Sequence, residues 1–202
     1  MKIRLVAVLP VLSLACVGLT GCDSKAGTAA VVSGHKISET QLSSYLRPDA
    51  PPVRSSDGSS SIAAKTFALQ YLVQNEVFSA LLAANGSPVT ESDLATAKTT
   101  VLQGRDEQVL TDQITKAGFT SKFEPVLLRN HELLTILQAK LTSNQQATAA
   151  LAKLKQGVSI SPRYGSWNQQ SLSLVGVGKK QLPSVLSFEG TLPGDVKLPT
   201  QQ

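Results

Sequence analysis

The chain has few of the residues that form disulfides and metal sites. Only two of its 202 residues are cysteines, and both lie in the first 22 positions, at Cys16 and Cys22. If those positions serve as a signal and a lipid anchor, no thiol is left for a disulfide or a cysteine-ligated metal. The two histidines, His35 and His131, are far apart and lack the His-x-x-x-His spacing of zinc sites. The sequence therefore predicts no metal and no cofactor.

Concentrated charge and catalytic motifs are also missing. The chain holds 19 Lys and Arg against 14 Asp and Glu, without a run of five or six like charges. A nucleic-acid-binding domain usually carries a basic stripe, so we expect no nucleic-acid partner. The nucleophile elbow, phosphate loop and dinucleotide fingerprint are absent, so no residue is predicted to be catalytic. Aromatic residues make up only 4% of the chain, so Leu, Val, Ile and Ala must build its core, which favours helices packed on helices.

The N-terminus carries the pattern of an export signal. Lys2 and Arg4 precede an uncharged apolar stretch, which ends in Leu-Thr-Gly-Cys at 19–22. A basic start, an apolar stretch and small residues before a cleavage point form a secretory signal peptide. The apolar stretch is shorter than the roughly 20 residues of a membrane-spanning helix. A plain secretory signal, or one that is kept as an anchor, would also fit the first part of this pattern.

The last four positions of this pattern resemble the signal of bacterial lipoproteins, in which a Leu and two small residues precede a Cys. The resemblance implies a signal peptide over 1–21, cleavage after Gly21 and a diacylglyceryl group on Cys22. Two acyl chains hold a protein stably on a membrane, at roughly 0.8 kcal/mol per buried methylene. The expected location is therefore the extracytoplasmic face of the cell membrane, with the protein held there by its lipid.

Residues 29–177 are predicted to form a single, mainly α domain, which fits the usual size of a domain. A short polar tether precedes it at 22–28, and a tail at 178–202 is predicted to be disordered. The segment 48–61 holds three prolines, a glycine and several serines, so we expect a flexible connection there. Helices are expected at 38–46, 62–85, 90–102, 106–116, 120–141 and 144–156.

The helix starts and the two longest helices carry the clearest local signals. Ser38 with Gln41, and Thr90 with Asp93, have the spacing of capping boxes, in which side chains pair with free helix-start amides. The segment 62–85 is apolar on more than one side, which is typical of a central helix. The other long helix has one apolar stripe and one polar side, so it requires a packing partner.

Two β-type segments flank the helices, at 29–33 and 158–163. Each is too short to be stable alone, and an unpaired strand would leave its amides and carbonyls without partners. We therefore predict that they pair as a small two-stranded element that joins the N- and C-terminal segments of the domain. Pro162 lacks an amide hydrogen, so it must lie at the end of its strand or face outward. A further apolar run follows at 172–177.

The order of these segments resembles the N-terminal domain of the SurA and PrsA type of extracytoplasmic chaperones. In that family, a strand of the form Ala-x-Val-x-Gly-x-x-Ile leads to a Ser or Thr that opens a helix, and residues 30–38 match this form. The junction at 81–91, with a Gly before a Thr-capped helix, looks like the family's junction. The segment 162–167 is similar to the tail strand of lipid-anchored actinobacterial members. The resemblance spans 29–167 and implies a helical chaperone domain.

The family's parvulin-type prolyl isomerase module has no counterpart in this sequence. About sixty residues follow Leu141 and none of them is a histidine, whereas that module has active-site histidines. The resemblance therefore implies a protein that is not an enzyme. Two alternatives stay open: an adaptor lipoprotein that binds one specific envelope partner, and a prolyl isomerase with an unrecognised site.

We therefore expect a membrane-anchored chaperone, or holdase, that binds unfolded or nascent secreted polypeptides. The expected binding site is an apolar groove whose walls are the helices at 62–85 and 120–141. Tyr164 and Trp167 could line such a groove, although a pair of this kind more often fills the core of a domain. Glu76, a charged residue among apolar neighbours, is interpreted as the exposed edge of its helix. The candidate peptide-binding residues are Phe67, Tyr71, Phe78, Tyr164 and Trp167.

Overall fold

The computed structural model describes residues 27–54, 61–103, 106–141 and 157–176, together with residues 149 and 152. Helices account for 57% and strands for 19% of these 129 residues. The protein is therefore a mixed α/β structure, and the predicted mainly α fold is wrong. The predictions that lie outside the described residues are the signal peptide with Gly21 and Cys22, most of the helix at 144–156, and the tail at 178–202.

Five helices and seven short strands follow one another along the described residues. The helices are α1 (Glu39–Ser44), α2 (Ala64–Ala84), α3 (Glu91–Leu102), α4 (Glu107–Lys116) and α5 (Glu124–Lys140). The strands are β1 (Thr28–Val32), β2 (His35–Ser38), β3 (Val53–Arg54), β4 (Ser61–Ile62), β5 (Val158–Ile160), β6 (Ser166–Asn168) and β7 (Ser173–Val175). Two 3₁₀ turns, η1 (Ser121–Phe123) and η2 (Pro162–Tyr164), precede α5 and follow β5.

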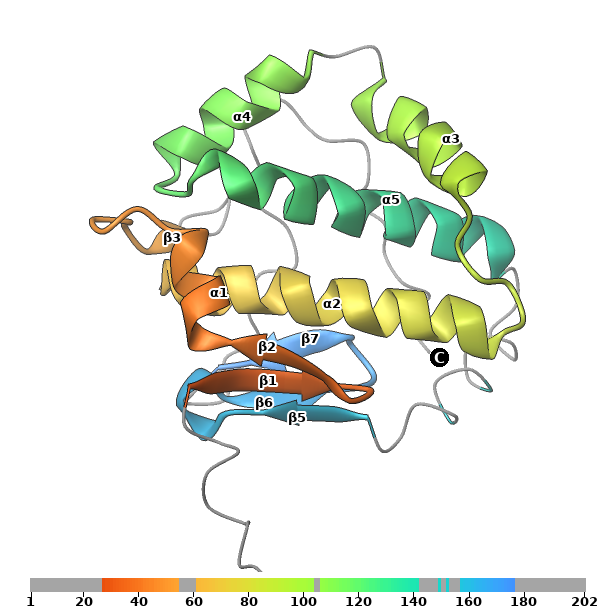
Figure 1. Ribbon diagram of the computed structural model, residues 1–202, viewed down its shortest axis with the longest axis horizontal. Helices are drawn as coiled ribbons and strands as arrows, with labels where there is room; N and C mark the ends of the chain where they lie inside the picture. Colours follow the sequence, from red (N-terminus) through yellow and green to blue (C-terminus); the bar gives the residue numbers. More distant parts are fainter. Residues whose placement is uncertain are drawn as a thin grey trace, which may run out of the picture.

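These elements form stacked layers (Figure 1). Helix α2 lies in the middle, with α5 packed along one side and the strands β1, β2 and β5 across the other. Helices α3 and α4 lie over the outer side of α5, and α1 stands near the start of α2. The β6–β7 hairpin lies beside the sheet and also contacts α2. The central helix is therefore covered by elements from both ends of the chain.

Side-chain caps confirm the predicted helix starts. Ser38 Oγ accepts a hydrogen bond from the amide of Gln41 at 3.0 Å and caps α1. Thr90 Oγ1 accepts from the Asp93 amide at 3.1 Å, and Asp93 Oδ2 accepts from the Thr90 amide at 3.0 Å, so both halves of this capping box are present. Asp106 caps α4. Each cap pairs an amide that a helix start otherwise leaves free.

The main sheet contains the strand pairing that the sequence predicted, and one strand more. β1 pairs antiparallel with β5, so that Val32 lies opposite Val158. On its other side β1 pairs with β2 across a turn at Ser33 and Gly34, whose φ angles of 49° and 88° fit a type I′ turn. The predicted two-stranded element is therefore a three-stranded sheet of order β2-β1-β5. Pro162 lies just beyond the end of β5, as predicted.

Two further hairpins account for the remaining strand content and for the error in fold class. β3 and β4 pair antiparallel within the segment 48–61, so the predicted flexible connection is in part a hairpin. Residues 55–60, between these strands, lie outside the described residues. β6 and β7 pair antiparallel, with Trp167 opposite Leu174. These strands have two or three residues each, which is too short for alternation of apolar and polar residues to reveal them.

The core is centred on α2. Thirteen of its 21 residues are buried and they include eight in succession, so every side of the helix is covered, which confirms its predicted central position. Helix α5 buries one stripe that includes Leu127 and Leu133. Helices α3 and α4 each bury only two residues. Apolar burial is therefore concentrated between α2, α5 and the strands, and the outer layer of α3 and α4 adds less.

Gly165 lies where the backbone comes close to the backbone of Val175. Replacing Gly165 by Ala should therefore cost about 3–4 kcal/mol of folding free energy. Its φ is +99°, and a Cβ there would overlap the carbonyl oxygen of Val175 and lie 2.9 Å from the carbonyl carbon. Gly34 is the matched control, because its φ is +88° but a Cβ would meet nothing within 4 Å. Gly34→Ala should cost only about 1–2 kcal/mol, the price of the left-handed backbone. Urea denaturation would compare the two, and equal losses would contradict a tight contact at Gly165.

Candidate functional site

The predicted peptide-binding residues on α2 lie in the core. Phe67, Tyr71 and Phe78 are at most 4% exposed. The rings of Phe67 and Tyr71 lie 5.8 Å from Phe119 and 6.0 Å from Phe123, respectively, between ring centroids. Aromatic pairs at such distances stabilise a packed interior. These side chains are part of the core, where Phe67 and Tyr71 pack against residues just before α5, so they do not line the open groove that we expected between α2 and α5.

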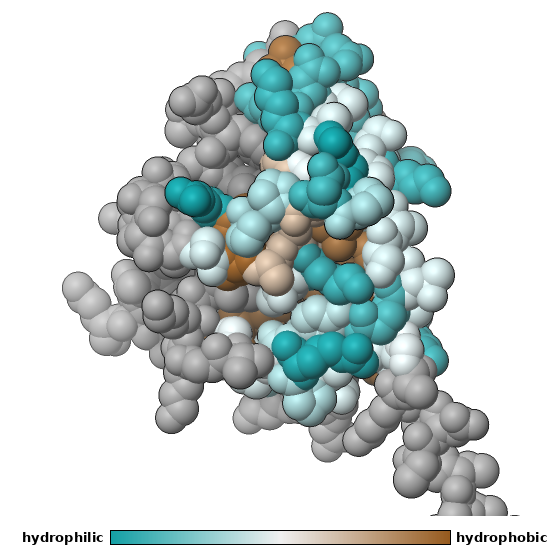
Figure 2. Space-filling model, turned by 90° about the vertical axis from the view of Figure 1, so that its left-hand side faces the viewer, coloured by the Kyte–Doolittle hydropathy of each residue, from teal (hydrophilic) through white to brown (hydrophobic). Residues whose placement is uncertain are grey.

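Tyr164 and Trp167 also occupy packing positions. Tyr164 is buried, and Trp167 is half-buried against the same core cluster as the residues of α2. On the face shown in Figure 2, hydrophilic side chains cover most of the described surface, and hydrophobic ones appear in small patches between them. The structure therefore brings the five candidates into one core rather than around an open surface.

A partly buried charged group ties Tyr164 to the first two helices. Its hydroxyl donates a hydrogen bond to Glu39 Oε2 at 2.8 Å. Lys65 Nζ and Arg163 Nη1 lie 3.6 Å and 3.5 Å from the same carboxylate. Burial and the Glu39 carboxylate both raise the pKa of Tyr164, so its hydroxyl stays protonated and remains a donor. This group joins α1, α2 and η2, and its role is to hold the C-terminal segment on the domain.

Three amide side chains form a polar cluster inside the α2–α5 interface. We refer to Gln74 and Asn75 of α2 and Asn130 of α5 as the amide cluster. Asn130 Nδ2 donates to Asn75 Oδ1 at 3.0 Å and lies 3.4 Å from Gln74 Oε1. Asn75 Nδ2 donates to the carbonyl of Val126 at 3.0 Å. Buried amides are costly unless they are hydrogen-bonded, so these bonds fix the orientation of each side chain.

The amide cluster holds a distant segment of the same chain, the turn residue Leu172 that immediately precedes β7. Gln74 Nε2 donates a buried hydrogen bond to the main-chain carbonyl of Leu172 at 2.9 Å. The side chains of Leu172 and Leu174 are 6% and 0% exposed and belong to the core cluster. Because Gln74 Oε1 faces Asn130, its NH₂ group points to Leu172. This hydrogen bond recognises a main-chain carbonyl, which every polypeptide has. The burial of the apolar side chains supplies the remaining stabilisation of the segment.

Sequence reasoning missed this contact. Asn130 has the spacing of the apolar stripe of the helix predicted at 120–141, and the run at 172–177 carries no signal beyond its apolar character. An Asn within an apolar stripe was the one available signal, since a buried amide needs a partner. Gln74 and Leu172 are 98 residues apart, and no local pattern connects them.

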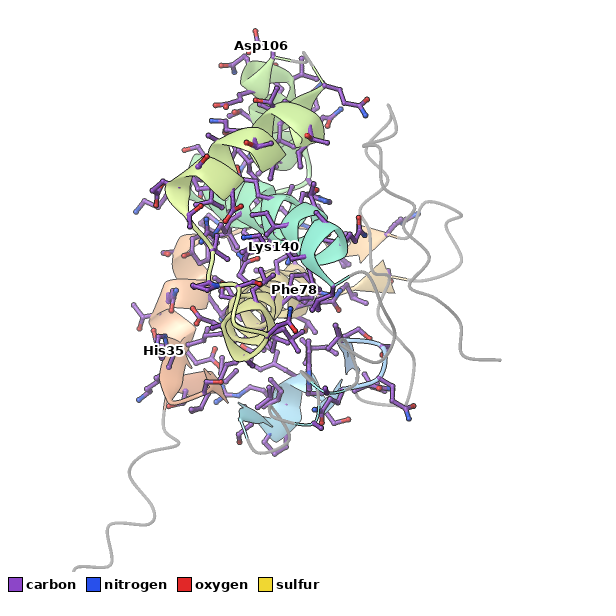
Figure 3. The ribbon with its side chains drawn as sticks, turned by 90° about the vertical axis from the view of Figure 1, so that its right-hand side faces the viewer. His35, Phe78, Asp106 and Lys140 are labelled. Atoms are coloured by element: carbon purple, nitrogen blue, oxygen red, sulfur yellow. The ribbon has the colours of Figure 1, made fainter. Side chains whose placement is uncertain are left out.

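The remaining titratable side chains have structural explanations. His35 Nδ1 lies 3.3 Å from Glu76 Oε2, and both side chains are well exposed, so this pair adds little stability. Figure 3 shows His35 at the outer edge of the molecule, whereas Phe78, a residue of α2, lies near its centre. Glu76 is therefore on an exposed edge of its helix, as we interpreted it. Burial lowers the pKa of His131 to about 4, so this imidazole is neutral at pH 7.

Lys140 fastens the end of α5 to the start of α3. Its Nζ lies 2.7 Å from Asp93 Oδ2, the same oxygen that accepts from Thr90 (Figure 3 labels Lys140). The hydrogen bond from Lys140, followed by those from Thr90, lowers the pKa of Asp93 to about 2. The carboxylate is therefore charged above pH 4, and this contact should weaken only in strong acid.

The described residues hold no group of three or more His, Cys, Asp or Glu side chains that could bind a metal ion. Within the same part of the chain, no helix combines the length and the apolar character needed to cross a membrane. No protein-family model, curated protein or solved structure matches this chain. What the protein does must therefore be inferred from its sequence motifs and from the geometry of the α2–α5 interface.

Proposed function

We propose that the protein is a membrane-anchored extracytoplasmic lipoprotein that binds unfolded or nascent secreted polypeptides without catalysing a reaction on them. The observation that carries the binding role is the hydrogen bond from Gln74 to the main-chain carbonyl of Leu172, with two leucine side chains buried beside it. A side-chain amide that binds a main-chain carbonyl, next to an apolar interior, can hold a polypeptide segment in the same way.

The chemistry of this contact suits many different clients. A neutral hydrogen bond to a carbonyl contributes about 1 kcal/mol and does not depend on the side chain that the client carries. Burying a leucine contributes about 1.5–3 kcal/mol, and any large apolar side chain supplies a similar amount. Weak backbone recognition with apolar anchoring is what a holdase requires, since it must bind many sequences and release them.

The proposed anchor places the domain close to the membrane. Five residues lie between Cys22 and Thr28, where β1 begins, so six residue-to-residue steps join the two. An extended chain spans at most about 3.3–3.6 Å per residue, so the start of β1 lies within about 20 Å of the lipid surface. Polypeptides that emerge from an export channel pass through the same layer, which favours a client-binding role there.

The holdase activity predicts that residues 23–202, produced without the lipid, slow the aggregation of several unrelated unfolded proteins at near-stoichiometric ratio. Light scattering during dilution from denaturant would measure this, with an inert protein of similar size as the control. Scattering curves that overlay the control for every client would contradict the proposal. Crosslinking to a single envelope protein without any suppression would instead identify a specific adaptor.

A further inference from the structure

The β6–β7 hairpin occupies the position in which the proposed function requires a client. We infer that residues 172–175, which are the turn residue Leu172 and strand β7, are an internal occupant of a peptide site on α2, and that a client segment with large apolar residues at positions i and i+2 displaces them. This inference rests on the proposed function and identifies both its site and its substrate class. Figure 1 shows β7 lying along α2, on the side away from α5.

β7 depends on α2 for its position. Among the described residues, it is paired as a strand only with β6, in a two-stranded sheet. Two-stranded hairpins are marginal in water unless they pack against something larger. The packing partner is α2, through the Gln74 hydrogen bond and the burial of Leu172 and Leu174. Removing those contacts should release β7 without breaking the main sheet, which β1, β2 and β5 form among themselves.

The occupant is held in a strained conformation. Leu172 has a φ of 48°, in the left-handed region that costs free energy for a residue with a Cβ. The strain persists because its side chain is buried and its carbonyl is bound to Gln74. A separate peptide does not have to turn back from β6, so it can place the same groups without this strain. A client therefore avoids the free-energy cost of this strain. That saving offsets part of the advantage that β7 has because it is covalently attached to the domain.

The buried groups define what the site accepts. Leu172 and Leu174 place two large apolar side chains in the core, and Ser173 between them is 1% exposed. The Ser173 hydroxyl lies 2.7 Å from the Ser171 hydroxyl, which satisfies its polar group locally. A charged middle residue would be buried without a partner, which is strongly unfavourable. The substrate class is an extended segment with two large apolar residues around a small one.

A tethered occupant lowers the measured affinity for a client by the fraction of time that the site is empty. A substitution that keeps β7 out should therefore tighten client binding. Leu174→Asp does this, because an aspartate cannot take the fully buried position of Leu174. Gln170→Asp is the matched control, since it adds the same charge at an exposed position in the β6–β7 turn.

The probe is a fluorescent acetylated peptide, Ser-Leu-Ser-Leu-Val-Gly, which copies residues 171–176. Its binding to residues 23–202 would be followed by fluorescence anisotropy. Leu174→Asp should lower the Kd at least tenfold relative to the unmodified chain and to Gln170→Asp. Adding Gln74→Leu to Leu174→Asp should reverse most of that gain. A folded Leu174→Asp chain that binds no tighter than the unmodified one would overturn the inference.

If Leu174→Asp does not fold, a second measurement on the unmodified chain tests whether a peptide displaces β7. Saturating peptide should accelerate hydrogen–deuterium exchange of the β7 amides while exchange in β1 and β5 stays constant. Unchanged exchange in β7 at saturating peptide would overturn the inference. The proposed function fails separately, if the unmodified chain suppresses no aggregation at all. Suppression that persists while β7 stays protected would leave the holdase role intact and exclude β7 as the occupant.

Discussion

A chain that ends at residue 157 should show no cooperative unfolding transition, whereas a chain that ends at residue 177 should melt within a few degrees of the full-length protein. The first truncation removes β5, the partner of the central strand β1, and leaves the buried strand residues Ala30 and Val32 without cover. It also affects two backbone hydrogen bonds at the ends of that pairing. The bond from Ser161 to Ala29 is lost, and Gly157, whose carbonyl accepts from Ser33, becomes a free terminus.

Three large buried side chains are lost at the same time, namely Tyr164, Leu172 and Leu174. Deleting such a side chain costs about 2–5 kcal/mol, so the three together cost about 6–15 kcal/mol. The stability of a domain is typically about 5–15 kcal/mol, so the loss consumes all or most of it. Circular dichroism during a thermal melt would measure both truncations. An unchanged midpoint for the chain that ends at 157 would show that the C-terminal strands do not close the fold.

Cys22→Ala should abolish lipid incorporation, the second large effect that we expect. The thiol is the only group at this position that can form the thioether of a lipoprotein anchor. Labelling with radioactive palmitate and the intact mass of the membrane-bound protein would both report the loss. Without the thioether, the variant should be released from the membrane or should keep its uncleaved signal peptide.

Cys16→Ala is the matched control, because it removes the other cysteine of the chain from within the signal. That variant should incorporate lipid as the unmodified protein does. If Cys22→Ala carried the same lipid mass as the unmodified chain, the lipoprotein assignment would be wrong, and a plain secretory signal or a retained signal anchor would replace it.

The sequence predicted those parts of the fold that depend on local signals. Thr90 and Asp93 have the spacing of a capping box, and the structure contains both of its hydrogen bonds. The continuous apolar character of α2 predicted its central position, because a helix that is apolar on every side must be covered on every side. The pairing of β1 with β5 followed from the need of two isolated strands for partners.

The fold class was wrong because strand content came from elements without a local signature. No strand was predicted at β2, where the sequence leads directly into the helix at 38–46, and β3, β4, β6 and β7 are two or three residues long. The site was missed for a related reason. Large apolar residues on α2 look the same whether they fill a core or line a groove, and only the packing of α5 shows that Phe67 and Tyr71 fill a core. The partner of Gln74 lies in a segment that approaches only after the whole domain has folded.

The place of β1 in its sheet has a consequence for the order in which the protein would fold during the proposed export. Ala30 lies opposite Ile160, so 130 residues separate two positions that are neighbours in the finished sheet. Contacts of such large sequence separation form late, because the long loop must be closed before they bring any gain. A chain that is exported from its N-terminus delivers β1 and β2 first and β5 only after all five helices have crossed. Until then the central strand would have one open edge, and the protein would itself be an incompletely folded polypeptide of the kind that it is proposed to bind.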